Sequence, residues 1–124
     1  MFVKHFIIAF ILLVIIDFFY LKFSSSELFA TIRSISGENP TKRYYSGILV
    51  YILLALGITL LLNPKNRKDA LIKGAIFGLV TYGVFDFTTH FMFRNWDLKT
   101  SVRDVTWGTI LCATVALLSK NDLF

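Results

Sequence analysis

A carboxylate stands where an apolar environment makes it costly: Asp86 lies inside the run GAIFGLVTYGVFDFTTHFMF of residues 74–93. A helix of this length spans about 30 Å, the thickness of the hydrocarbon core of a bilayer. An aspartate near the middle of such a helix costs about 2.5–3.5 kcal/mol on insertion, so it needs a compensating partner. Asp86 is therefore the first candidate for chemistry inside a membrane, which would be the binding or movement of a proton, a small molecule or a lipid head group.

The side chains that share a helix face with Asp86 are those three and four residues away from it. These residues are Tyr82, Gly83, Thr89 and His90. They would place a phenol, a hydroxyl and an imidazole on one stripe with the carboxylate, and such a stripe faces protein or water rather than lipid. His90 could equally be an interfacial histidine with no role in a site.

Two other carboxylates are candidates for the same cluster. Asp17 lies near the end of the first apolar run, and Asp104 lies at the start of the fourth. If successive helices alternate in direction, all three aspartates lie toward one side of the membrane, because odd helices end there and even helices begin there. Arg94 and Arg103 belong to that side too, and either could form a structural ion pair with Asp86.

Each companion aspartate also has an interpretation without chemistry. Asp104 follows Ser101 by three residues, which is the spacing of a capping box, and an acid is favoured in the first turn of a helix. Asp17 could lie near the interface and pair with Lys22, although a spacing of five residues is poor for that pair.

The sequence gives little support for a metal site or for a common catalytic motif. Asp86 and His90 are four residues apart on one helix face and could offer two ligands, but one histidine and scattered acids match no metal-binding pattern. A nucleophile elbow, a phosphate-binding glycine loop and a Cys-x-x-Cys motif are all missing from the sequence. We predict no metal site and assign no catalytic residue and no cofactor.

The elements that position these residues are four apolar segments. In a chain of 124 residues, 56% are hydrophobic and the mean hydropathy is +0.67, which is the wrong balance for a soluble domain of this size. The segments cover residues 3–22, 44–62, 71–93 and 102–118. Four crossings are too few to close a membrane β-barrel. The sequence therefore predicts an all-α polytopic membrane protein, with residues 1–124 forming one compact bundle of four transmembrane helices.

Two parts of this chain admit a second interpretation. The first apolar segment could be a signal peptide cleaved near Ser24–Ser26, although Asp17 and the aromatic residues that follow it disfavour this. In the loop of residues 23–43, apolar residues recur at helical spacing, which predicts a short interfacial helix between the first two crossings; an ordinary ordered loop is the alternative.

Small and aromatic residues indicate how the bundle packs. Gly74 and Gly78 form a small-xxx-small pair that lets another helix approach closely, on a face separate from that of Asp86. Gly83 and Gly108 are further candidates for helix packing. The two tryptophans, Trp96 and Trp107, are expected to anchor the protein in the interfacial belt.

The distribution of basic residues indicates the membrane topology of the chain rather than a nucleic-acid partner. The formal charge of +5 comes from basic residues in short clusters beside the apolar segments, as in juxtamembrane anchors, so we predict no nucleic-acid binding. The bilayer is the expected partner, and a homo-oligomer or a partner in a membrane complex is compatible with the glycine face. Four bases within residues 63–73 favour a multi-pass protein with both termini in the cytoplasm.

Several of these residues also carry a family resemblance. The motifs are the run from Tyr82 to Thr89, Trp96, the segment Asp104-Val105-Thr106-Trp107-Gly108, the run from Asp17 to Leu21, and the pair Val50-Tyr51. Together they resemble the predicted membrane protein family known as domain of unknown function 2177. The resemblance implies a four-crossing membrane protein and supplies no activity.

Three functions are therefore open. The first is a polar intramembrane site that binds or moves a small molecule, a lipid head group or a proton. The second is an accessory or structural subunit of a membrane complex, docked through the face of Gly74 and Gly78. The third is a small intramembrane enzyme that uses Asp86 and His90 as an acid–base pair.

Overall fold

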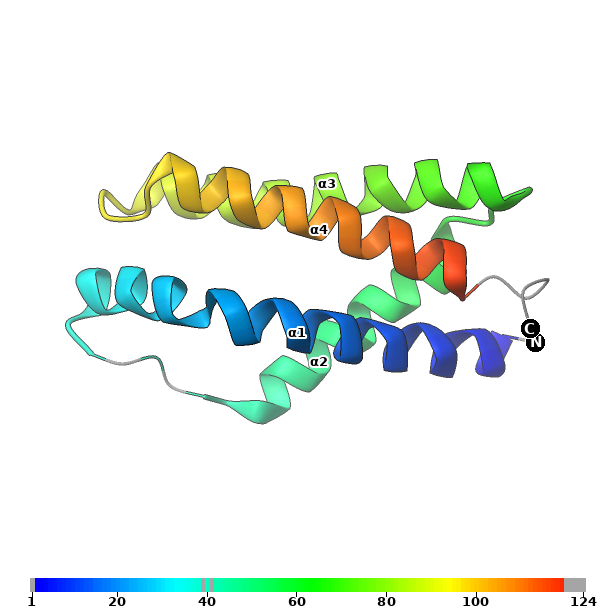
Figure 1. Cartoon of the computed structure of the whole chain (residues 1–124), viewed down its shortest axis with the longest axis horizontal. Helices are drawn as coiled ribbons and strands as arrows, with labels where there is room; N and C mark the ends of the chain where they lie inside the picture. Colours follow the sequence, from blue (N-terminus) through cyan, green and yellow to red (C-terminus); the bar gives the residue numbers. More distant parts are fainter. Residues whose placement is uncertain (1, 39, 41, 120–124) are drawn as a thin grey trace.

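The computed structural model, which describes residues 2–38, 40 and 42–119, consists of long helices that run back and forth (Figure 1). The elements are α1 (Phe2–Ser36), α2 (Tyr44–Leu56), the short π-helix η1 (Gly57–Leu61) that continues α2, α3 (Arg67–Met92) and α4 (Leu98–Leu118). The model has four helices, counting α2 and η1 as one, that are long and apolar enough to cross a membrane. This confirms the predicted all-α bundle of four membrane-spanning helices.

The first helix differs most from its predicted extent. α1 runs without a break from Phe2 to Ser36, so residues 23–36 continue it and form no separate interfacial helix. The serines of this stretch do not break the helix, because their hydroxyls bond to carbonyls of the preceding turn, as Ser24 does to Tyr20 at 2.8 Å. The helix ends only at Gly37, whose φ of +79° is the left-handed conformation that favours glycine.

Side-chain caps set the starts of α3 and α4. The Asn66 side chain accepts the backbone N–H of Asp69 at 2.8 Å, so α3 begins at Arg67, ahead of the predicted start. Asp97 does the same for α4 by accepting the N–H of Thr100 at 2.9 Å. The proposed cap that paired Ser101 with Asp104 is therefore wrong, because Asp104 lies beyond the first turn of the helix that Asp97 caps.

Glycines let α3 and α4 pack backbone to backbone. A Cβ atom on Gly78 would lie 2.2 Å from the carbonyl oxygen of Gly108, and one on Gly74 would lie 2.6 Å from that of Cys112. Both glycines therefore face α4 of the same chain. Because α4 also covers Asp86 through Ser101 and Asp104, the prediction that the glycines lie on a separate face from Asp86 is wrong. Gly83 is different, because a Cβ there would meet no described atom within 4 Å.

A small apolar core joins the other helices to this pair. It combines Ala9 and Leu13 of α1 with Leu54 and Ala55 of α2, Ile58 of η1, and a set of residues on α4. The α4 members are Leu111, Cys112, Val115 and Ala116. Figure 1 shows α1 beside α4 and α2 crossing the bundle obliquely. Near one end of the bundle, His5 of α1 bonds to the hydroxyl of Ser119 just after α4, at 3.1 Å.

Candidate functional site

The most isolated polar group among the described residues is the carboxyl of Asp86. The residue is 0% exposed, and neither carboxyl oxygen receives a hydrogen bond from a nitrogen or hydroxyl donor of the described chain; the side chain that it faces is the carboxyl of Asp104, which can bond to it when one of the two carries a proton. Its backbone is held firmly: the Ser101 hydroxyl of α4 donates to the Asp86 carbonyl at 3.0 Å and accepts the Trp96 indole N–H at 3.0 Å. The carboxyl is therefore fixed in place and left without a nitrogen or hydroxyl donor.

Asp104 of α4 brings a second carboxyl to this place. It interacts electrostatically with Asp86 and is half-buried. It lines two hollows. The first, named the Asp104 hollow, has a volume of about 330 Å³ and is lined by Val50, Leu54, Thr81, Tyr82, Phe85 and Asp104. The second, the side hollow, has a volume of about 30 Å³ and is lined by Tyr20, Leu21, Ser24, Leu28, Thr100, Arg103 and Asp104.

Asp17 is also buried, at 8% exposed, but its carboxylate has donors. The Tyr51 hydroxyl of α2 donates to one oxygen, and the Trp107 indole N–H of α4 donates to the other at 2.8 Å. The Trp107 ring stacks on Tyr20, with ring centroids 4.5 Å apart and an interplanar angle of 11°. Asp17 thus joins three helices, and the alternative in which it pairs with Lys22 is not found among the ion pairs of the described residues.

Tyr82 lies near both aspartate sites. Its ring covers Gly108, where a Cβ would lie 2.1 Å from the ring, and it lines the Asp104 hollow. Its phenol is within electrostatic range of both Asp17 and Asp104. The structure therefore brings Tyr82 close to Asp17 and Asp104, and Asp86 lies one turn further along the helix of Tyr82 and beside Asp104.

Thr89 and His90 do not take part in this cluster. The Thr89 hydroxyl bonds to the Phe85 carbonyl of its own helix at 2.7 Å, and His90 Nδ1 donates to the Trp96 carbonyl at 2.6 Å. Because Asp86 receives no hydrogen bond from a nitrogen donor of the described chain, His90 is not its acid–base partner in this structure. The helical spacing placed these residues on one stripe, but the chain leaves α3 just beyond them and folds back at Trp96.

The arginines and tryptophans occupy other positions than those predicted. Arg103 forms an ion pair with Glu27 on the extension of α1, and Arg94 is exposed. Neither bonds to Asp86. Trp96 is only 5% exposed, and Trp107 bonds to Asp17, so both have bonded positions within the protein and are not simple belt anchors.

Sequence reasoning assigned no site role to Tyr51, and gave Trp107 a different one. The available signal was the position of these two residues. Tyr51 lies mid-way along the second apolar segment and Trp107 lies within the fourth. Both are hydrogen-bond donors inside the membrane, where the carboxylate of Asp17 needs donors. A search for clusters of three or more His, Cys, Asp or Glu residues that could hold a metal ion finds none among the described residues.

The outward surface of the bundle defines the class of protein. Large apolar side chains such as Phe18, Val84 and Phe91 are more than half exposed on long helices, as expected for surfaces in contact with lipid. The chain is an integral, multi-pass membrane protein.

The family follows from comparison with known proteins. A family model described as a predicted membrane protein, DUF2177, matches residues 2–120. The chain therefore belongs to this family, as its motifs suggested. No curated protein and no solved structure shows significant similarity to it. The family description names no activity, so function has to be argued from the carboxyl groups.

Proposed function

We propose that this protein holds an intramembrane polar site in which Asp86 and Asp104 bind, and help to move, a proton or the hydrogen-bond donor of a small molecule or lipid head group. The observation that carries the proposal is the carboxyl of Asp86, which is completely buried, receives no hydrogen bond from a nitrogen or hydroxyl donor of the described chain, and faces a second carboxyl, that of Asp104. An unsatisfied buried polar group costs about 1–3 kcal/mol, and more when it is charged. A cost of this size is usually retained where a ligand or a proton can satisfy the group.

The chemistry of the pair supports a donor as the ligand. Two neighbouring carboxyls offer acceptor oxygens and repel each other when both are ionised, so a proton or a cation between them relieves the repulsion. Neither arginine of this end supplies that charge to Asp86, because Arg103 is bonded to Glu27 and the Asp86 oxygens receive no hydrogen bond from a nitrogen of the described chain.

The hollows beside Asp104 support access to the pair. The side hollow has room for about one water molecule and is lined partly by the polar side chains of Ser24, Thr100 and Arg103. The Asp104 hollow is lined mostly by apolar side chains. Asp104 can therefore exchange a proton or a donor group with a partly polar space and with an apolar one.

The expected membrane topology indicates which side of the membrane the site faces. With both termini in the cytoplasm, as the bases of residues 63–73 favour, the loop of residues 93–97 lies on the opposite side of the membrane. Asp86 and Asp104 are about one to two helical turns from that loop, so the site communicates with the non-cytoplasmic side.

One observation argues against each of the two alternatives, the accessory subunit and the intramembrane enzyme. For an accessory subunit, the docking face of Gly74 and Gly78 is occupied by α4 of the same chain. For an intramembrane enzyme, the pair of Asp86 and His90 is not formed, because His90 bonds to the Trp96 carbonyl. Partners that bind other faces, including a second copy of this chain, remain compatible with the polar site.

The test compares Asp86→Asn with the full-length protein in lipid nanodiscs. Infrared spectroscopy detects the C=O stretch of a protonated carboxyl, and native mass spectrometry detects small molecules that stay bound. We expect the unmodified protein to show a protonated carboxyl, a bound small molecule or both, and Asp86→Asn to lose that signal while it melts at the same or a higher temperature. Thr88→Ala, on the same helix but an exposed position, is the matched control.

Two results contradict the proposal. If Asp86→Asn unfolds the protein, the carboxyl is structural. If the infrared and mass signals are missing from the unmodified protein, or are unchanged in Asp86→Asn, the pair binds no donor.

A further inference from the structure

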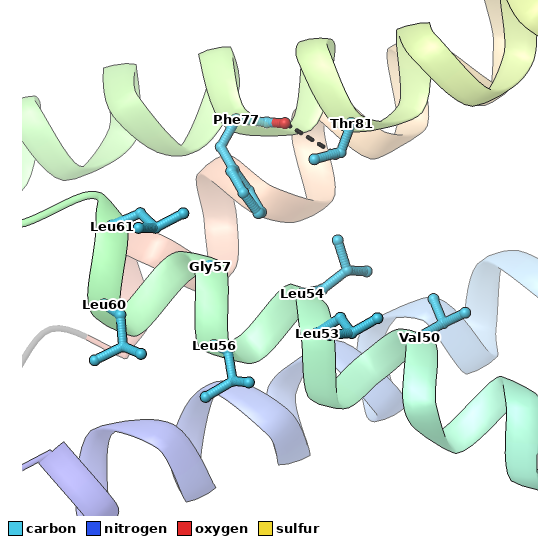
Figure 2. Close-up of a pocket in the computed structure, with 9 residues that line it drawn as sticks. All are labelled: Val50, Leu53, Leu54, Leu56, Gly57, Leu60, Leu61, Phe77 and Thr81. Atoms are coloured by element: carbon cyan, nitrogen blue, oxygen red, sulfur yellow. Dashed lines mark hydrogen bonds between the residues drawn. The ribbon is translucent and has the colours of Figure 1, made fainter.

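An apolar groove separates α2 and η1 from α3. It is lined by Phe77 and Thr81 of α3 and by residues of α2 and η1, of which Leu54 points toward α3 and Leu56 and Leu60 point away from it (Figure 2); its volume is about 490 Å³. Volumes of a few hundred cubic ångströms are typical of ligand sites. The groove offers no free polar group on α3, because the Thr81 hydroxyl donates to the Phe77 carbonyl at 2.9 Å.

The groove continues into the Asp104 hollow. Val50, Leu54 and Thr81 line both spaces. From Leu61 to Val50 the shared α2–η1 wall is about 16 Å long at 1.5 Å per residue. The result is one elongated space, apolar along its length and acidic at one end, where Asp104 lines it. Asp86, the electrostatic neighbour of Asp104, is 0% exposed and lies behind it without lining the space.

A contact between α3 and η1 crosses the groove. The chain changes from α-helix to π-helix at Gly57, and the Phe77 ring of α3 reaches across to it (Figure 2). A Cβ on Gly57 would lie 2.3 Å from that ring, so the contact requires glycine. π-Helical turns often mark functional positions in helices.

The surroundings identify what can occupy the space. Leu53 is 58% exposed and Leu61 is 75% exposed, on a helix that crosses the membrane, so the groove opens to lipid chains rather than to water. The acidic end is complementary to a positive charge and repels an anionic head group.

We infer that the groove binds a bilayer amphiphile that carries a protonated primary amine, with one alkyl chain along the groove and its ammonium group at Asp104. The inference rests on the proposed function and specifies the ligand of the same carboxyl pair. The ammonium group donates to Asp104, the carboxyl that lines the hollow and that repels Asp86 when both are ionised, and the alkyl chain lies along the apolar side chains of the groove.

The experiment uses the full-length protein in phosphatidylcholine nanodiscs. The probe is a single-chain alkylamine with a photoreactive diazirine in its chain, and the matched probe is the alkyl carboxylic acid of the same length. We expect the amine to label peptides of α2, η1 and α3 that line the groove, and the acid to label them far less.

A pair of variants on one helix tests the location. Leu53→Trp fills the groove, whereas Leu49→Trp adds the same ring at a similarly exposed position that lines none of the described spaces. We expect Leu53→Trp and Asp104→Asn each to weaken binding of the amine by about tenfold or more, and Leu49→Trp to leave it unchanged. Equal effects of the two tryptophans, or equal labelling by amine and acid, would overturn the inference.

The two proposals fail in different ways. If Leu53→Trp binds the amine normally while Asp86→Asn still removes the carboxyl signal, only the groove is wrong. If Leu53→Trp blocks the probe but Asp86→Asn changes neither the carboxyl signal nor amine binding, the groove holds alkyl chains without help from the carboxyls, and both the amine specificity and the proposed function fall.

Discussion

Asp17 and Asp86 are both buried aspartates inside the bundle, and their surroundings differ sharply. Asp17 receives hydrogen bonds from Tyr51 and Trp107, which belong to two other helices. Asp86 is buried more completely and receives none from a nitrogen or hydroxyl donor of the described chain, with a second carboxyl as its neighbour. A satisfied carboxylate joins helices and stabilises them, whereas an unsatisfied one weakens the fold in which it lies.

This difference separates two roles that the sequence alone does not distinguish. The polar contacts of Asp17 connect α1, α2 and α4 and account for its burial completely. The burial of Asp86 comes from the close approach of α3 and α4 at Gly78 and from the Ser101 bond to its backbone. The carboxyl of Asp86 is thus carried into the interior by its neighbours and contributes no bond of its own.

The largest expected effect is on the satisfied site. Asp17→Ala removes two hydrogen bonds to a charged group and leaves the Tyr51 hydroxyl and the Trp107 N–H without an acceptor. We expect a loss of about 2–4 kcal/mol in the free energy of unfolding, measured by reversible unfolding in mixed micelles. Tyr51→Phe, which removes one of the two bonds, should lose about half as much. An unchanged stability of Asp17→Ala would show that this site does not join the helices.

The next effect concerns the contact that buries Asp86. In Gly78→Ala the new methyl would overlap the Gly108 carbonyl, so α3 and α4 must move apart. We expect a cost of about 1–3 kcal/mol and increased solvent exposure of the Asp86 region, measured by hydrogen exchange.

Gly83→Ala is the matched control on the same helix, because its new Cβ meets no described atom within 4 Å. It should be neutral or slightly stabilising, since alanine favours a helix more than glycine does. Equal costs of the two substitutions would show that the glycine contact is not what holds Asp86 inside.

The third effect has the opposite sign to the first. Asp86→Leu replaces an unsatisfied carboxyl with an apolar side chain of similar size, and we expect a gain of about 1–2 kcal/mol in the free energy of unfolding. The same unfolding assay measures it. A loss similar to that of Asp17→Ala would mean that Asp86 has a stabilising partner, and the contrast between the two aspartates would disappear.

The sequence predicted the helices better than the contacts of the site. Long apolar runs and the cost of open backbone in lipid predict four helices directly, and helical spacing brought Tyr82 beside Asp86. The spacing of residues on one helix does not show how much of that helix its neighbour covers. Thr89 and His90 were therefore wrongly grouped with Asp86. The partners of Asp17 depend on the relative depth and rotation of three helices, and no local pattern encodes either.

The smallest expected effect comes from a third aspartate, which is satisfied like Asp17 but exposed. At the start of α4, the side chain and backbone N–H of Thr100 hydrogen-bond to the Asp97 carboxylate and lower its pKa. A group with a lowered pKa in the folded protein stabilises it fully above the ordinary aspartate pKa of about 4, and this stabilisation is lost as the pH falls through the lowered value.

Asp97→Asn keeps an acceptor for the helix cap, as Asn66 provides for α3, but the asparagine side chain does not titrate. The difference in melting temperature between the unmodified protein and Asp97→Asn should therefore be constant near neutral pH and shift against the unmodified protein only below about pH 4. A loss of stability as large as that expected for Asp17→Ala would show that hydrogen bonds to a carboxylate stabilise this fold whether or not the carboxylate is buried. The difference between Asp17 and Asp86 would then depend only on their hydrogen-bond donors.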